Sequence, residues 1–428
     1  MQHGLPAEQT KILQITILAV GSRGDVQPYY ALALGLQRAG HQVQIATHAN
    51  FEAFVSHQGL EFAPVAGDYN QLLRSEEGQK LLEGERVKLV SDELFQQQMA
   101  DAWVACQGTD VVIFNPLATW GYNIAEKLAV PCFMAATMPL SPTRTFPFLN
   151  FALASRTSFD RLRNYASYLL VEFLFWQQQR KQVNLFRQQT LGLPPLPFLG
   201  ARFRSKKPHN LYPLRVLYGF SPIVIPKPPD WPEFLNVTGY WLLDQAKDYQ
   251  PPKELLGFLD DGPPPVSVGF GSMTIRNLQL VTKLVIEALE ESQQRGILLS
   301  GWAGIGNVNL PDRVFVIDDV PHDWLFPRMA AVVHHGGAST TAAGLRAGVP
   351  SVIVPFFADQ PAWGQRLAEL GVSPPPVPYK ELSVKRLAAT IRRAVSDKVM
   401  REQAIALGKR IRAEDGVAKA VEAFYRCL

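Results

Sequence analysis

Short apolar runs alternate with longer amphipathic stretches along the first part of the chain. The run at 12–20 meets a glycine-containing turn at 21–24, and a helical pattern then leads to the next apolar run at 42–47. Later runs at 110–115 and 132–136 also alternate with helical patterns. Such alternation predicts a doubly wound parallel sheet, whose ligands bind beyond the carboxyl ends of the strands. The turn at 21–24 is expected at such an end.

Asp25 directly follows this turn, where a helix N-cap is expected, and Pro28 would then lie in the first helical turn. An aspartate at this place has two interpretations: it caps the helix, or it presents a carboxylate to a ligand. The pattern alone favours the cap.

A second alternating series follows two proline-rich stretches at 226–232 and 250–252. Its apolar runs and helical patterns resemble those of the first series and lie at 263–270, 276–294, 297–300 and 314–317, with a helical region at 382–428. The sequence therefore predicts two Rossmann-like α/β domains facing a central cleft. Their expected bounds are 1–225 and 253–428, with a linker at 226–252.

The stretch 331–360 is predicted to form a strand, a Gly-Gly turn, a helix and a second strand. Glycines let backbone N–H groups approach a ligand, and the new helix presents unpaired donors and the positive end of its dipole. Asp359 and Gln360 follow the second strand. An anion site beside a carboxylate and an amide suits a nucleotide sugar.

Composition sets further limits. At 428 residues the chain suits two domains, and a net charge of +4 is too small to indicate nucleic acid. Three widely spaced cysteines predict neither a disulfide framework nor a zinc site. The apolar run at 12–20 lacks a basic leader, and no apolar stretch is long enough to span a bilayer. A cytoplasmic protein, either free or peripheral to a membrane, is expected.

Basic and aromatic residues are concentrated at 140–215. Twelve Lys or Arg stand there against two acidic residues, so this stretch carries 12 − 2 = +10. We expect a helical insert in the N-terminal domain. Either its helices pack on the domain with solvated charges, or they form a surface for an anionic membrane and a lipophilic acceptor.

Two segments resemble a known family. HHGGASTTAAGLRAGVPSVIVPFFADQPAWG at 334–364 resembles the donor-binding signature of family 1 glycosyltransferases, in the form found in sterol 3β-glucosyltransferases and in bacterial enzymes that glycosylate lipids and antibiotic aglycones. GSRGDVQPYYALALGL at 21–36 is similar to the amino-terminal signature of the same group. The resemblance implies a GT-B architecture, whose last helix, at 416–427, crosses back to the first domain.

The resemblance also implies roles for individual residues. Asp25 would be the general base, and its neighbours Ser22, Arg23 and Gly24 would border the donor. The diphosphate would contact the second glycine turn and its surroundings, at Ser272, His335, Gly337, Ala338, Ser339 and Thr340. Asp359 and Gln360 would bind sugar hydroxyls, whereas Trp302 and Val320 would contact the nucleotide base. Asp25, Asp359 and Gln360 also have a structural interpretation as helix caps, and Trp302 has one as a core residue.

Three positions qualify this assignment. Ser339 stands where the family more often has glycine, which adds a hydroxyl without removing an amide. Ala343 occupies the place of a ribose-binding glutamate in plant relatives, so ribose recognition is expected elsewhere. His334 is expected to be structural, because no carboxylate stands at metal-ligand spacing from it.

The predicted function is that of an inverting, metal-independent hexosyltransferase without a cofactor. It would move a hexose, glucose in the leading case, from a nucleotide sugar such as UDP-glucose to a hydroxyl of a sterol-like or other polycyclic alcohol. The alternatives are a macrolide, polyketide or other secondary-metabolite glycosyltransferase, and a nucleotide-sugar-binding protein without turnover. Contact with an anionic membrane would accompany transfer to a sterol-like alcohol.

Overall fold

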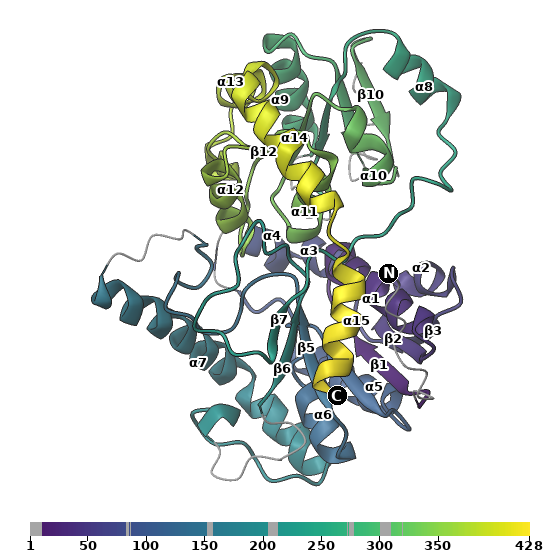
Figure 1. Ribbon diagram of the computed structural model, residues 1–428, viewed down its shortest axis with the longest axis vertical. Coiled ribbons are helices and arrows are strands. Elements are labelled where there is room, and N and C mark those ends of the chain that lie inside the picture. Colours follow the sequence, from purple (N-terminus) through teal and green to yellow (C-terminus); the bar gives the residue numbers. More distant parts are fainter. Residues whose placement is uncertain are drawn as a thin grey trace, which may run out of the picture.

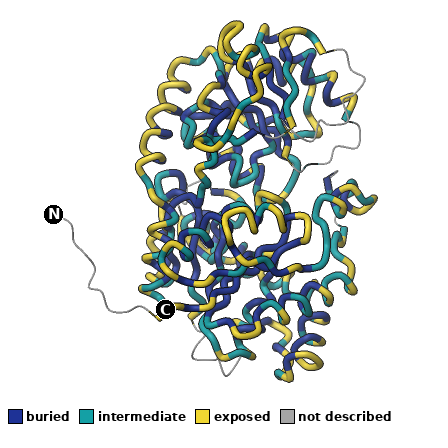
Figure 2. The backbone as a smooth tube through the Cα atoms, turned by 90° about the vertical axis from the view of Figure 1, so that its right-hand side faces the viewer, coloured by how far each residue is buried: buried dark blue, intermediate teal, exposed yellow. Residues whose placement is uncertain are grey.

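The computed structural model describes residues 11–82, 85, 87–151, 157–203, 213–271, 273, 278–299, 310–318 and 320–428. Two domains lie one above the other, and each contains a parallel sheet with helices packed against it (Figure 1). Buried backbone runs through the interior of both domains, and exposed backbone lies mainly on the outer helices and loops (Figure 2). The alternating pattern of the sequence therefore predicted the fold class correctly.

The first domain contains a seven-stranded sheet in the order β3-β2-β1-β4-β5-β6-β7. Its strands are β1 (Gln14–Leu18), β2 (Gln42–His48), β3 (Glu61–Val65), β4 (Val111–Phe114), β5 (Cys132–Ala136), β6 (Arg215–Tyr218) and β7 (Leu235–Val237). Every pair of neighbours is parallel. β4, at the centre, is buried at all four positions, which explains its continuous run of apolar residues.

The helices of this domain follow the strands in the expected order. They are α1 (Arg23–Arg38), α2 (Glu52–Ser56), α3 (Tyr69–Arg74), α4 (Glu76–Leu82), α5 (Asp92–Ala105), α6 (Gly121–Leu128) and α7 (Ser158–Gln189). The sequence predicted several helices in the basic insert. Its described residues instead form a single helix of 32 residues, α7, followed by irregular chain and a short 3-10 turn (Ala201–Phe203). Proline and glycine at 192–200 prevent the helix from continuing.

The second domain has a five-stranded parallel sheet in the order β10-β9-β8-β11-β12. Its strands are β8 (Val266–Gly269), β9 (Gly296–Leu299), β10 (Val314–Ile317), β11 (Ala331–His334) and β12 (Ser351–Ile353). Its helices are α8 (Lys253–Asp260), α9 (Leu278–Glu291), α10 (His322–Leu325), α11 (Ala338–Ala347), α12 (Gln360–Glu369), α13 (Val384–Ser396) and α14 (Lys398–Arg412).

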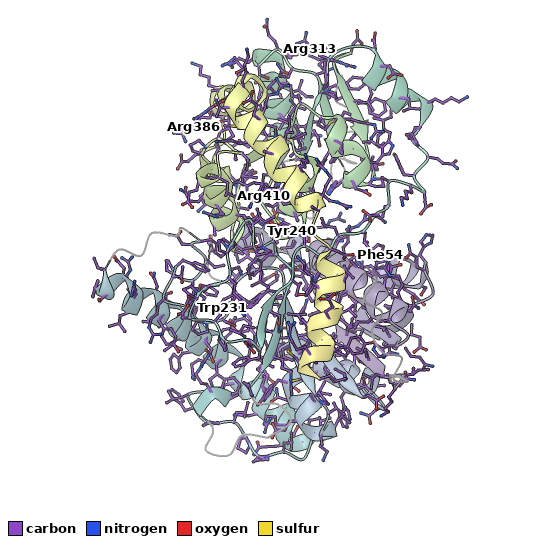
Figure 3. All side chains as sticks on the ribbon, in the orientation of Figure 1. Phe54, Trp231, Tyr240, Arg313, Arg386 and Arg410 are labelled. Carbon is purple, nitrogen blue, oxygen red and sulfur yellow. The ribbon has the colours of Figure 1, made fainter. Side chains whose placement is uncertain are left out.

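The linker expected at 226–252 needs correction. β7 lies within that range and pairs with β6, so the first domain continues to Gly239, whose N–H donates to Phe220 O. A strand of three residues between prolines is too short to show alternation, and the sequence pattern therefore missed it. The connection to the second domain begins at Tyr240, which lies between the two domains (Figure 3).

The last helix, α15 (Gly416–Cys427), leaves the second domain and packs against α1 and β6 of the first. Phe424 is fully buried there, 5.1 Å from Phe133 between ring centroids. The two crossing connections touch at Gly416, where a Cβ would lie 2.3 Å from Tyr240 O. A side chain at Gly416 would therefore force the two connections apart.

Candidate active site

Ser22, and not Asp25, is the N-cap of α1, and Asp25 is the third residue of the helix. The Asp25 carboxylate reaches back to the cap, where Oδ2 accepts hydrogen bonds from Ser22 N (2.9 Å) and Ser22 Oγ (2.8 Å). Asp25 thus belongs to a capping box, and the expected N-cap at Asp25 was wrong by three positions. Pro28 consequently lies in the second turn of the helix.

Gly21 and His48 hold the turn that carries this carboxylate. Gly21 has φ of +128°, and a Cβ there would lie 2.7 Å from Asp25 Oδ2, so only glycine leaves room for it. Gly21 N donates to His48 Nε2 (3.1 Å), and His48 Nδ1 lies 3.2 Å from Val65 O. Burial lowers the pKa of His48, which fits a neutral ring that accepts on one nitrogen and donates on the other. No motif in the sequence identifies His48.

Burial changes the acidity of the Asp25 carboxyl. Burial raises the pKa of its carboxyl above 3.8, although the bonds from Ser22 and the proximity of His48 oppose this shift. A higher pKa brings a carboxylate closer to the range useful for general-base catalysis at neutral pH.

The second glycine turn connects β11 to α11. Gly336 has φ of +89°, and Gly337 is the N-cap of the helix. The first turn of α11 is closed by Thr341 N, which donates to Gly337 O (2.9 Å). The amides of Ala338, Ser339 and Thr340 precede that bond and have no acceptor within the helix, so this end is suited to a phosphate.

His335 lies over this turn. A Cβ on Gly337 would lie 2.3 Å from its Nε2, and one on Gly271 would lie 3.1 Å from its Cε1. Its Nδ1 is buried and has no hydrogen-bond partner within the described part of the chain. Burial lowers the pKa of His335 to about 4, so the ring is neutral at pH 7.

His334 is a structural residue. It is almost completely buried, and its Nδ1 accepts a hydrogen bond from Gly336 N (3.1 Å), which shapes the turn. Burial lowers its pKa well below the ordinary value. Among the described residues, no group of three or more His, Cys, Asp or Glu could hold a metal ion.

Asp359 and Gln360 follow β12 and differ in their surroundings. Gln360 is buried, and its Oε1 accepts from Phe356 N (2.8 Å), so this side chain stabilises its own turn. Asp359 is the N-cap of α12 without a side-chain cap bond, and its Oδ2 accepts from Trp363 Nε1 (2.8 Å). Burial raises the pKa of Asp359 to about 6.

The two halves of the site meet. Ser339 Oγ in the second domain donates to Gly24 O in the first (2.9 Å), next to Asp25. Besides burial, the negative charge of Asp25 contributes to the raised pKa of Asp359. Tyr69, which no motif identified, lies near both carboxylates: its pKa is raised first by burial and then by Asp25 and Asp359. The structure therefore brings Asp25 and Asp359 together with the glycine turn at 335–340, which we call the phosphate turn.

Four other residues were predicted to bind the donor. Val320 is buried in an apolar cluster that also contains Leu299 and Trp324. Arg23 is exposed, and its guanidinium lies 5.7 Å from the centre of the Phe54 ring. Ser272 and Trp302 lie outside the described residues.

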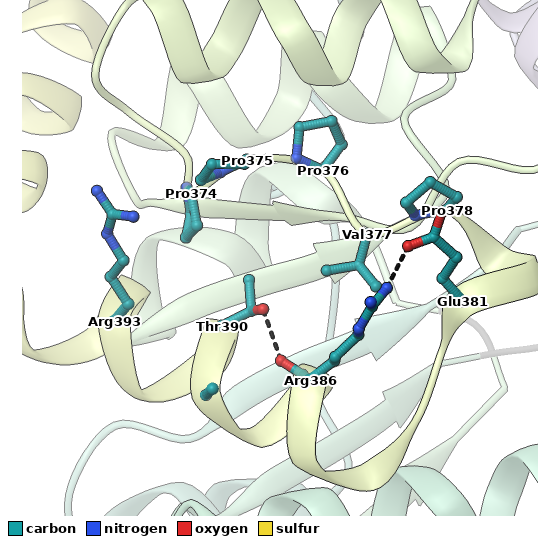
Figure 4. A pocket seen from close by; sticks show the side chains of 10 residues that line it. Pro374, Pro375, Pro376, Val377, Pro378, Glu381, Arg386, Thr390 and Arg393 are labelled. Carbon is teal, nitrogen blue, oxygen red and sulfur yellow. Dashed lines mark hydrogen bonds and ion pairs between the residues drawn. The ribbon is translucent and has the colours of Figure 1, made fainter.

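A hollow of about 360 Å³ lies elsewhere, on the second domain between the proline-rich loop at 374–378 and α13 (Figure 4). Arg386 and Glu381 form an ion pair at its edge. None of its lining residues is a predicted site residue, so we assign it no part in the site. Within the described ranges, no helix is both long and apolar enough to cross a membrane.

The chain matches known proteins in both domains. Residues 15–147 match the family model of the glycosyltransferase family 28 N-terminal domain, and residues 297–423 match that of the erythromycin biosynthesis protein CIII-like C-terminal domain. The sterol 3-beta-glucosyltransferase UGT80B1 of Arabidopsis thaliana is 40% identical over 97% of this chain and 68% of its own length. A sterol 3-beta-glucosyltransferase of Emericella nidulans is also 40% identical, over 99% of this chain but 30% of its own length.

Solved structures with the same architecture include the glycotransferase of kitacinnamycin and the calicheamicin glycosyltransferase CalG4. The first has a TM-score of 0.69 at 20% identity, with 98% of this chain and 100% of that chain covered. The second has a TM-score of 0.66 at 16% identity, with 98% and 99% covered. At these identities the likeness shows the fold, which is GT-B as the sequence predicted. Together with the plant and fungal relatives, this fold establishes that the chain belongs to the sterol 3-beta-glucosyltransferase family of glycosyltransferases.

Proposed function

We propose that the protein transfers glucose from UDP-glucose to the 3β-hydroxyl of a sterol or a closely similar polycyclic alcohol, with inversion at the sugar. The observation that carries the proposal is the meeting of Asp25 with the phosphate turn at the domain junction, through the bond from Ser339 Oγ to Gly24 O (2.9 Å). Relatives named as sterol 3-beta-glucosyltransferases that align with nearly the whole chain support both donor sugar and acceptor.

In this proposal Asp25 removes the acceptor proton as the oxygen attacks the sugar carbon. Its raised pKa suits the role, and Gly21 and His48 fix its position. The departing UDP gains negative charge, which the amides at the start of α11 and the helix dipole stabilise. His335 adds a neutral hydrogen bond. We propose that these groups act without a metal ion or other cofactor.

Asp359 is proposed to accept hydrogen bonds from sugar hydroxyls. Gln360 is engaged with its own turn through Oε1, so only its amide nitrogen, 3.7 Å from Met273 Sδ, remains for a ligand. We therefore propose Asp359 as the main sugar contact. The described residues do not include Trp302, and the choice of UDP over another nucleotide rests on the family resemblance of the sequence.

We also propose that the enzyme takes its acceptor at a membrane surface, through one face of α7. Phe159, Leu162, Leu170 and Leu174 are 72%, 66%, 58% and 56% exposed, and helical spacing places them along one stripe. Arg163 and Lys181, which helical spacing places beside this stripe, are exposed as well, and Arg163 pairs with Asp160 (3.5 Å). The first turns of α7 extend beyond the rest of the domain (Figure 1). An apolar stripe with basic neighbours fits an anionic bilayer, where sterols reside.

The deciding experiment is an acceptor screen followed by mass spectrometry. The purified protein is incubated with UDP-glucose and with sterols, hopanoids or macrolides presented in mixed micelles. A mass increase of one hexose on sterols, and its absence on macrolides, is expected. Transfer to macrolides alone would contradict the proposal, and so would UDP release without any modified acceptor.

A further inference from the structure

The carbonyl group of Gly24 lacks its normal donor within α1. In an α-helix each carbonyl accepts from the N–H four residues later, and for Gly24 that residue is Pro28, which has no N–H. Because Ser22 is the N-cap, Pro28 lies beyond the first turn, where a missing donor leaves a real gap in the helix. The Gly24 oxygen is therefore available to a partner from outside the helix.

That partner is Ser339. Its Oγ donates to Gly24 O at 2.9 Å, although the two residues lie 315 positions apart and belong to different domains. Ser339 is the second residue of α11, so the bond joins the beginnings of two helices that face the same site. A Cβ on Gly24 would lie 3.9 Å from Ser339 Oγ, an ordinary contact distance, so the approach is close without crowding.

Only the hydroxyl of Ser339 is used in this bond. Its backbone amide, at the start of α11, remains directed out of the helix. The two groups of one residue can therefore serve different partners: the hydroxyl contacts the first domain, and the amide contacts an anion.

We infer that Ser339 is a positioning residue that holds the two domains in the closed arrangement through the Gly24 carbonyl, so that the phosphate turn stands opposite Asp25 before the donor arrives. The bond between Ser339 and Gly24 would act as a latch at the site. The consequence for donor binding rests on the proposed function, whereas the closed arrangement itself does not.

Other contacts keep the domains attached when the latch is removed. Arg366 Nε donates to Val224 O (2.8 Å), and Tyr240 packs in an apolar cluster with Ala342 and Leu345. Loss of the hydroxyl should therefore open the site without unfolding the protein. A single hydrogen bond of this kind changes the ratio of closed to open molecules about two- to tenfold, and donor affinity should fall by up to this factor.

The first test measures domain separation without any substrate. Spin labels are attached to Glu52→Cys and Lys283→Cys, two exposed helical positions in different domains, in a Cys427→Ser background. Ser339→Ala is expected to lengthen or broaden the distance distribution, whereas Ser339→Thr, which keeps the hydroxyl, should retain the original one. Identical distributions for the original protein and Ser339→Ala would overturn the inference.

The second test asks whether Ser339 acts through the Gly24 carbonyl. Pro28→Ala restores an N–H at position 28, so the carbonyl gains a donor within α1. The dissociation constant for UDP, measured by calorimetry, should rise by up to about tenfold for Ser339→Ala and by a smaller factor in the Pro28→Ala background. Equal factors in both backgrounds would show that the hydroxyl acts through another partner.

These measurements separate the inference from the proposed function. The label distances require neither a donor nor an acceptor, so they still test the latch if no sterol is glucosylated. If sterol transfer is found but the distances do not respond, the latch fails and the proposed function stands.

Discussion

The indole Nε1 of Trp363 donates a 2.8 Å hydrogen bond to Oδ2 of Asp359. Trp363 is fully buried, and its ring centre lies 5.1 Å from that of Phe151, which follows β5 in the first domain. The orientation of the proposed sugar-binding carboxylate therefore depends on packing between the two domains.

Trp363→Phe keeps an aromatic ring but removes this bond. Since Asp359 then loses a donor that favours its ionised form, kcat/KM for UDP-glucose should fall about tenfold or more. Trp231→Phe is the matched control, because it also removes an indole bond, to Pro142 O (3.2 Å), in the same apolar cluster. Equal losses in both variants, measured by initial rates, would mean that packing alone is responsible.

Asp359→Asn should make the protein more stable at neutral pH. Burial raises the pKa of Asp359 from 3.8 to about 6, so the folded state binds this proton more tightly than the unfolded chain. Its contribution to stability is present below pH 3.8 and is lost as pH rises to about 6. Between pH 3.8 and about 6 the melting temperature of Asp359→Asn should therefore rise relative to that of the original protein. Above this range the difference between the two melting temperatures should stay constant. A constant difference at every pH would contradict the shifted pKa.

Asp25→Asn should lower kcat by about 10²- to 10⁴-fold, since the amide accepts the bonds from Ser22 but no proton from the acceptor. The measurement is steryl glucoside formed per unit time, with circular dichroism to establish folding. Asp110→Asn is the control: Asp110 accepts from Gln14 N (2.9 Å) where β1 begins, at the opposite end of the strand from Asp25. A folded Asp25→Asn enzyme with normal turnover would remove Asp25 from the role of base.

The pH profile should have its acidic limb above the ordinary pKa of an aspartate. Asp25 must be ionised to act, and burial raises its pKa above 3.8, so activity falls as pH decreases through that raised value. Asp359, with a pKa raised to about 6, also titrates on the acidic side, so the limb that remains in Asp359→Asn is the one that reports on Asp25. His335, with a pKa lowered to about 4, stays neutral from pH 6 to 8 and adds no step there. His335→Ala should lower kcat about 10²-fold without moving the limb. A limb that shifts in His335→Ala would assign the titration to His335.

Acidic substitutions in α7 should release the enzyme from membranes. Leu162→Glu with Leu170→Glu places two charges in the exposed stripe, and binding to phosphatidylserine vesicles at low salt should fall at least tenfold in sedimentation assays. Val104→Glu is the control, because Val104 is 70% exposed on α5. If the original protein does not sediment with the vesicles, or if light scattering shows that the stripe joins two copies of the chain, the membrane proposal is wrong.

The sequence predicted the parts of the fold that depend on local pattern. The strand, glycine turn and helix at 331–347 lie where the residues indicated. A buried β-branched run favours a strand, and a glycine with positive φ favours a tight turn. Parallel order in both sheets also followed from the alternation of elements.

The sequence could not predict features that depend on tertiary contact. Ser22 and Asp25 are both good capping residues, and only the path of the chain decides which one begins the helix. His48 and Tyr69 reach the site from separate elements outside both signature segments, and Trp363 lies within 334–364 but makes a contact that the segment itself does not indicate. The carbonyl of Gly24 receives Ser339 only because the domains come together.

Because Phe424 fills the space beside Phe133, the core of the first domain includes residues from the far end of the chain. The first domain can therefore be completed only after α15 has left the ribosome, and a fragment cut before α15 would have a cavity where this helix packs. Adding α15 as a separate peptide should restore the packing of such a fragment. This junction is therefore a suitable place to divide the enzyme into two parts whose association can be followed by activity.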